Sequence, residues 1–117
     1  MQKIVDELEI VNAATIDRLD EFTDFLYQRS HRKGLDQRDC HKLASRDRHV
    51  FSALMLAHDM ADGMVTGATR KSAHVLKLIN HVFDAEPGDG AVGVTALLAR
   101  GRLVLLADTL VREWPTE

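Results

Sequence analysis

The segment TRKSAHVLKLINHVFD, residues 69–84, places basic and imidazole side chains at a spacing suited to phosphoryl chemistry. Four of its residues, separated by four, three and four positions, share one face of a helix: Arg70, His74, Lys77 and His81. A solvent-exposed imidazole nitrogen can attack a phosphoryl group, and a cation one turn away can balance the charge of that group. We therefore predict an exposed binding face made of these four residues.

The residues SAHVLK within this segment resemble the AHxLK core of histidine phosphotransfer domains. This resemblance implies that His74 accepts a phosphoryl group and that Lys77 is its electrostatic partner. The family has a glycine after the lysine, whereas this sequence has Leu78 there. A histidine phosphotransfer-like signalling domain is therefore one alternative for the function.

A second alternative comes from the longer run TGATRKSAHVLKLIN, which looks like the turn and second helix of helix-turn-helix repressors. The resemblance implies that Gly67 lies at the turn and that the basic residues of the following helix contact DNA phosphates and base edges. Asp62 stands where the motif has an apolar residue. A DNA-binding protein is therefore a second alternative, and binding to nucleic acid is not favoured.

Polar residues on otherwise apolar helix faces suggest a third alternative. Asp47, His58 and Asp108 fall inside such faces, where a polar group needs a partner. The segments ALMLAHDMADG and LLADTL resemble the central and downstream motifs of HD-domain phosphohydrolases. The resemblance implies metal-dependent hydrolysis with four ligands: His31, His58, Asp59 and Asp108. The simpler interpretation is a core His58 bonded to an aspartate or to a backbone carbonyl.

Other features of the sequence exclude several classes of site. Cys40 is the single cysteine of the 117 residues, so neither an internal disulfide nor a CxxC metal site is possible. The sequence has no glycine-rich phosphate loop, no GxSxG elbow and no HExxH pair. The start MQKIVDELEI lacks the features of a signal peptide, and no apolar run is long enough to span a membrane. We expect a cytoplasmic protein without a membrane segment or a cofactor.

Charged residues are unevenly distributed, although the net charge is only −3. Residues 1–27 contain seven acids and two bases, whereas residues 29–49 contain seven bases and three acids. Such a basic surface can bind phosphate or an acidic partner, or it can be neutralised within the molecule or across a dimer.

Apolar residues recur at helical spacing in four segments, which are residues 2–30, 36–62, 69–84 and 91–114. Gly34 is expected to terminate the first helix, and Asp36 and Thr69 are expected to cap the second and third. The last segment is apolar almost all round, so it needs neighbours on most sides. We therefore predict an all-α fold, an antiparallel bundle of about four helices in a single domain over residues 1–117. The C-terminal helix is expected to form the interface of a homodimer.

None of the sets of catalytic residues considered above is complete in the sequence. We therefore favour a non-enzymatic regulatory module that binds an unidentified protein partner through its charged outer faces. No catalytic residue and no metal site is expected, and the four metal ligands named above apply only if the HD alternative holds.

Overall fold

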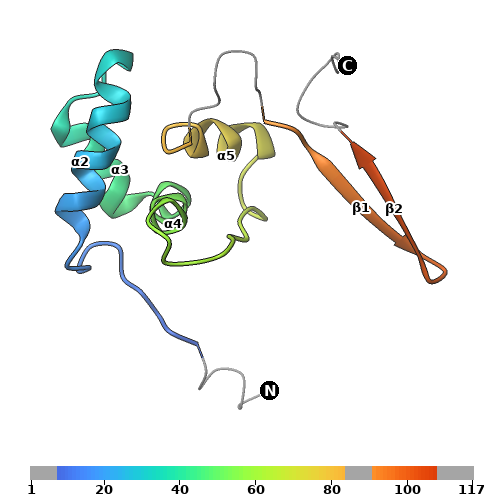
Figure 1. Cartoon of the computed structure of the whole chain (residues 1–117). Helices are drawn as coiled ribbons and strands as arrows, with labels where there is room; N and C mark the ends of the chain where they lie inside the picture. The colour runs from blue at the N-terminus through green and yellow to red at the C-terminus, as the bar shows by residue number, and fades with distance from the viewer. Residues whose placement is uncertain (1–7, 84–90, 108–117) are drawn as a thin grey trace. The chain divides into compact units, whose positions relative to one another are not determined.

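The chain divides by its internal contacts into two units, Met1–Asp84 and Ala85–Glu117. In this computed structural model the described residues are 8–83 and 91–107. The first unit contains helices and the second contains a two-stranded antiparallel sheet (Figure 1). The predicted all-α bundle is therefore wrong. A single domain over residues 1–117 remains a prediction.

The described part of the first unit contains five helical elements. They are α2 (Leu19–Ser30), the 3-10 turn η1 (His31–Lys33), α3 (Gln37–Arg46), α4 (Arg48–Ala57) and α5 (Ser72–Ile79). No helix among the described residues is long and apolar enough to cross a membrane.

The first helix is shorter than predicted. Its predicted span was residues 2–30, but α2 begins at Leu19, and residues 8–18 are not helical. Asn12 explains part of this difference, because its side chain accepts a hydrogen bond of 2.9 Å from the Ala14 amide. A short polar side chain that bonds to nearby backbone offers the chain an alternative to the helix. The C-terminal end is as predicted, with Gly34 in the left-handed conformation after η1.

The second predicted helix, residues 36–62, is divided in two at Asp47. This residue has extended backbone angles, and it ends α3 and begins α4. Its carboxylate accepts hydrogen bonds from the amides of His49 (2.9 Å) and Val50 (3.2 Å), so it is the N-cap of α4. The predicted cap at Asp36 is confirmed, because its side chain accepts from the Asp39 amide at 2.7 Å.

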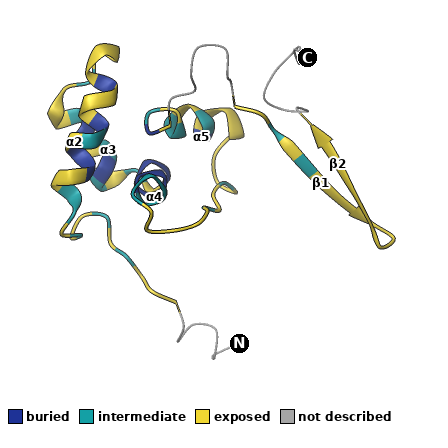
Figure 2. Ribbon diagram, in the orientation of Figure 1, coloured by how far each residue is buried: buried dark blue, intermediate teal, exposed yellow. Residues whose placement is uncertain are grey.

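The core of the first unit lies where α2, α3 and α4 pack together. Its fully buried apolar residues in these helices are Phe22, Leu26, Cys40, Ala44, Val50, Ala53 and Leu54, and Val82, which follows α5, belongs to the same cluster. Figure 2 shows the buried parts of these three helices in dark blue. The rings of Phe22 and Phe51, 5.9 Å apart, connect α2 to α4. Removal of these apolar surfaces from water is the main term that stabilises the unit.

The third predicted helix, residues 69–84, is observed as the shorter α5. Thr69 is not its cap, because Lys71 occupies the cap position and makes no side-chain capping bond. Val75 is buried and His74 is exposed, as predicted. The amphipathic pattern therefore identified the faces of this helix correctly and its ends incorrectly.

The fourth predicted helix, residues 91–114, is a β-hairpin in its described part. Strand β1 (Val94–Ala99) pairs antiparallel with β2 (Arg102–Ala107), with Leu97 opposite Val104. Arg100 (φ 51°) and Gly101 (φ 73°) form the two-residue turn, and positive φ at both positions matches the twist of the strands. An apolar run without alternation fits a buried strand as well as a buried helix.

Because this segment forms strands in its described part, the predicted dimer contact through a C-terminal helix is also wrong. Homodimerisation itself stays a prediction.

Cys40 provides a chemical test of the core. Burial raises the pKa of its thiol, and the carboxylates of Asp36 and Asp39 raise it further. We expect the folded chain to react with a thiol reagent at pH 8 roughly 100-fold more slowly than free cysteine, and at the full rate in urea. A native rate equal to that of free cysteine would contradict this packing.

The raised pKa of Cys40 also predicts that the free energy of unfolding falls above about pH 8.5, where unfolded Cys40 ionises first.

Candidate phosphate-binding pocket

Three consecutive residues at the start of α4 bind the segment that leads to α5. We call Asp47, Arg48 and His49 the α4 anchor. The Arg70 guanidinium lies 3.2 Å from the Asp47 carboxylate. The Arg48 guanidinium donates a hydrogen bond to the Thr69 hydroxyl, and His49 Nδ1 is hydrogen-bonded to the Thr66 hydroxyl.

Each of these links joins α4 to a different position between residues 66 and 70. Asp47 is only 14% exposed, so its ion pair is partly shielded from water, although Arg70 is 43% exposed. An ion pair with one exposed partner contributes up to about 1 kcal/mol. The three links together fix the segment at several points, which a single surface contact would not do.

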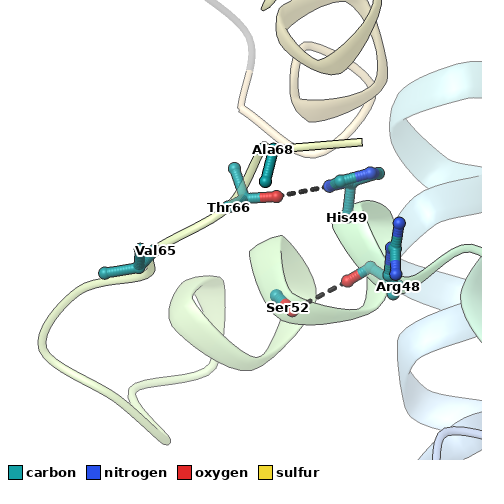
Figure 3. A pocket seen from close by; sticks show the side chains of 7 residues that line it. Arg48, His49, Ser52, Val65, Thr66 and Ala68 are labelled. Atoms are coloured by element: carbon teal, nitrogen blue, oxygen red, sulfur yellow. Dashed lines mark hydrogen bonds between the residues drawn. The ribbon is translucent and has the colours of Figure 1, made fainter. Parts of the chain in front are cut away.

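An open pocket of about 370 Å³ lies between the α4 anchor and this segment. Its lining residues are Arg48, His49, Ser52, Val65, Thr66, Gly67 and Ala68. Figure 3 shows the Thr66 hydroxyl directed at the His49 ring. None of the described residues that line the pocket is acidic, and Arg48 contributes a cation. The pocket is therefore suited to a small anion.

The backbone of the lining segment has an unusual conformation. Gly67 has φ +125° and Ala68 has φ +63°. An ordinary residue rarely adopts the first value, so Gly67 is needed there, and the left-handed conformation of Ala68 costs roughly 1–2 kcal/mol. Non-glycine residues held in this region occur often at functional sites, because surrounding contacts must keep them there.

His49 is the buried member of the pocket, with 2% of its surface exposed. Its Nδ1 bonds to Thr66, whereas its Nε2 is buried and has no hydrogen-bond partner among the described residues. A buried polar atom without a partner is costly. The hydrogen bond between His49 Nδ1 and Thr66 therefore orients both the imidazole ring and the Thr66 hydroxyl.

The binding face predicted on the third helix lies beside this pocket in sequence but does not line it. Arg70 is paired with Asp47, and its guanidinium is 3.3 Å from His74 Nε2. Lys77 is exposed on α5, whereas His81 is half-buried and has an interaction partner. The four residues therefore do not form one uniformly exposed stripe.

The structure does not assemble the ligands of the HD alternative, and no cluster of three or more potential metal ligands is found in residues 8–83 and 91–107. His31 Nδ1 lies 3.1 Å from the Tyr27 carbonyl. His58 is turned inward, as predicted, and its Nδ1 bonds to the Leu54 carbonyl at 2.8 Å. Asp59 is exposed with φ 56°, and Asp108 lies outside the described residues.

A model of the phosphate acetyl/butaryl transferase family matches residues 2–117, nearly the whole sequence. The chain belongs to this family. The family's domain is of the α/β class, which agrees with the presence of both helices and a hairpin.

Curated relatives of the chain include two kinds of enzyme. The chain is 46% identical over 109 residues to an NADP-dependent malic enzyme of Rhizobium meliloti, which covers 93% of the chain and 14% of that protein. It is 35% identical over 108 residues to a probable NADP-dependent malic enzyme of Rickettsia prowazekii, covering 92% of the chain and again 14% of the relative. A phosphate acetyltransferase of Corynebacterium glutamicum is 29% identical over 108 residues, which are 92% of the chain and 32% of that protein. The chain thus spans a third or less of the length of each of these relatives.

Membership of the phosphate acetyl/butaryl transferase family corrects the predicted function. The chain is an enzyme-related domain, and the prediction of a non-enzymatic regulatory module is wrong. The phosphotransfer, helix-turn-helix and HD interpretations are wrong for the same reason.

The sequence analysis also missed the residues of the pocket. Arg48 and His49 were assigned to the middle of one long helix, and GMVTGAT was interpreted as a connecting loop that, in the helix-turn-helix alternative, contains the turn at Gly67. The signal available was Asp47 itself, a good N-cap residue inside an apolar pattern, followed 20 residues later by a glycine-containing loop.

Substitutions of Asp47 separate its two roles. Asp47→Ala removes the cap of α4 and the Arg70 pair, and we expect it to lower the free energy of unfolding by about 1–2 kcal/mol. Asp47→Asn keeps a capping oxygen and loses only the charge pair, so its cost should be smaller, up to about 1 kcal/mol. Urea unfolding measures both values.

The control for this series is Asp36→Ala, which removes the cap of α3 without touching the pocket segment. Asp47→Ala should accelerate hydrogen exchange at Thr66 and Thr69, and Asp36→Ala should not. Equal exchange in the two variants would show that Asp47 does not hold this segment.

Proposed function

We propose that this chain supplies a phosphate-binding part of an acyltransferase that moves an acetyl or related acyl group to or from phosphate. Family membership supports an enzyme of this class, and the Corynebacterium glutamicum relative is named a phosphate acetyltransferase. The proposal depends on the open pocket lined by Arg48, which is bonded to Thr69, and by Thr66, which is bonded to His49. None of the described residues that line this pocket is acidic.

Arg48 is the main phosphate ligand in this proposal. Its guanidinium has five N–H donors in a planar fork, and among the residues that the structure describes one bond is formed, to the Thr69 hydroxyl. The others can reach an anion, and hydrogen bonds between arginine and phosphate are strengthened by charge. The Thr66 hydroxyl adds a neutral partner, since His49 holds it at the rim of the same pocket.

The proposed chemistry assigns a limited role to these residues. In one direction a phosphate oxygen attacks the acyl carbonyl, a new C–O bond forms, and the bond from the carbonyl to its leaving group breaks. In the other direction phosphate leaves as the acyl group passes to an acceptor. Arg48 would position the phosphate for attack and stabilise the negative charge that develops when phosphate leaves. The acceptor and the residues that activate the carbonyl are not assigned within this chain.

The exposed basic residues of α5 have a secondary role in this proposal. Lys77 and His74 are exposed on the helix that follows the pocket segment, and Arg70 lies at the junction. Clustered basic side chains raise the local concentration of anions and increase the rate at which they bind. We propose that the predicted face of Arg70, His74, Lys77 and His81 contributes to the attraction of anions rather than to the pocket itself. A cytoplasmic location stays a prediction.

Phosphate binding by the full 117-residue chain tests the proposal. We expect inorganic phosphate and acetyl phosphate to shift the amide resonances of residues 65–68 in an NMR titration. Arg48→Ala should weaken binding by about tenfold or more, and Arg48→Lys should recover part of it because the charge remains without the fork.

The matched control is Arg46→Ala, which removes a nearby exposed cation that does not line the pocket. This variant should bind phosphate as the unaltered chain does. Equal weakening by the two alanine variants, or shifts that spare residues 65–68, would contradict the assignment of this pocket.

A further inference from the structure

A second open pocket, of about 600 Å³, adjoins the candidate phosphate-binding pocket. Residues 9–13 form part of its lining, and the end of α3 and one side of α4 form the rest. Arg48 and Ser52, about one helical turn apart, line both pockets. Figure 3 shows the bond that joins them, in which the Ser52 hydroxyl donates to the Arg48 carbonyl at 2.7 Å. The two pockets therefore meet at these two residues, and every lining residue belongs to the first unit.

The second pocket has a large apolar component. Its large apolar lining residues are Ile10, Val11, Phe51 and Met55. Val11 and Met55 also pack against the buried core, so this part of the lining is held in place. Pockets of several hundred Å³ that combine apolar walls with a few polar groups are typical of small-molecule sites. An apolar part of a ligand would be removed from water here, which favours binding.

The charged residues of the second pocket favour an anion. Arg46 and Arg48 line it together with one acid, Glu9. Arg46 is the last residue of α3 and is exposed. In the described part of the chain the Arg46 guanidinium forms no ion pair, and neither arginine is paired with Glu9. An anion would therefore find a cation that is not neutralised by any described residue.

We propose that the second pocket binds an organic anion, a monocarboxylate with a short aliphatic chain, and that this anion opposes phosphate binding in the first pocket. The carboxylate pairs with Arg46 and Arg48. The chain lies against Phe51 and Met55. The acyl chain of an acyl phosphate held in the first pocket fits less well, because an uncharged chain does not use the charge of Arg46.

Arg48 couples the two pockets, because it lines both of them. Its guanidinium carries one positive charge, and a carboxylate and a phosphate that both approach it repel each other. Each anion therefore lowers the affinity for the other, by the same factor in both directions. This coupling rests on the proposed phosphate site, whereas carboxylate binding to the second pocket does not.

An NMR titration of the 117-residue chain with hexanoate tests the site. We expect hexanoate to shift the amide resonances of residues 9–13 and the methyl resonance of Met55. Acetate has the charge without the chain, and hexanol has the chain without the charge. Both should bind about tenfold or more weakly than hexanoate, since each buried methylene raises affinity roughly fourfold and the ion pair adds to this.

Charge variants test the role of the arginine that only the second pocket contains. Arg46→Ala should weaken hexanoate binding by about tenfold and leave phosphate binding unchanged. Glu9→Gln should strengthen hexanoate binding by roughly twofold to fivefold, because a repelling carboxylate is removed. The matched control is Arg38→Ala, on the same helix, which does not line this pocket and should bind hexanoate normally.

A methionine pair tests the apolar part of the pocket. Met55→Gln keeps the length of the side chain but makes it polar, and it should weaken hexanoate binding by about tenfold. Met60→Gln, at a methionine that is 39% exposed and does not line the pocket, should have no effect.

Competition between the two anions completes the test. Saturating hexanoate should weaken phosphate binding by about fivefold or more. Hexanoate shifts that spare residues 9–13, equal binding of acetate or hexanol, or phosphate binding that hexanoate leaves unchanged or strengthens would each overturn the proposal. So would butyryl phosphate that binds more tightly than acetyl phosphate and loses this advantage in Met55→Gln, since the pocket would then hold an acyl chain. A chain that does not bind phosphate at all would contradict the proposed function, and the hexanoate titration would then decide the second pocket alone.

Discussion

The arrangement of the pocket segment depends on the carboxylate of Asp47. This group caps α4 through the amides of His49 and Val50 and also pairs with Arg70, which follows the segment that lines the pocket. A continuous helix through this position would leave no free amides for the carboxylate to bind. The break places Arg48 and His49 in the first turn of α4, where both side chains reach the segment that precedes α5.

The pocket is stabilised by the same set of contacts that shape it. The left-handed Ala68 costs free energy, and so does the buried Nε2 of His49, which has no hydrogen-bond partner in the described part of the chain. The three links of the α4 anchor offset that cost. The fixed segment gives a ligand little to reorder on binding, because Arg48 and Thr66 are already held by the protein. The local strain and the shape of the pocket thus result from the same contacts.

Local features of the sequence predicted local features of the structure. The left-handed Gly34 and the exposed His74 follow from turn preference and from helical periodicity, and both are observed. The break at Asp47 was missed because the apolar periodicity continues through it. The hairpin was missed because a strand buried on both sides and a buried helix share one pattern, although Arg100-Gly101 marked a turn. The pocket could not be predicted from spacing, since it is formed by contacts between segments about 20 residues apart.

The state of the His49 ring tests this account most directly. Nitrogen-15 NMR of the imidazole at a pH where free imidazole is neutral distinguishes a single tautomer from an average of two. If the α4 anchor holds the pocket, His49 shows one tautomer, and Thr66→Val restores averaging or shifts the Nδ1 resonance while Thr69→Val does not. An averaged His49 ring in the unaltered chain, insensitive to Thr66, would contradict the central claim that this contact fixes the pocket.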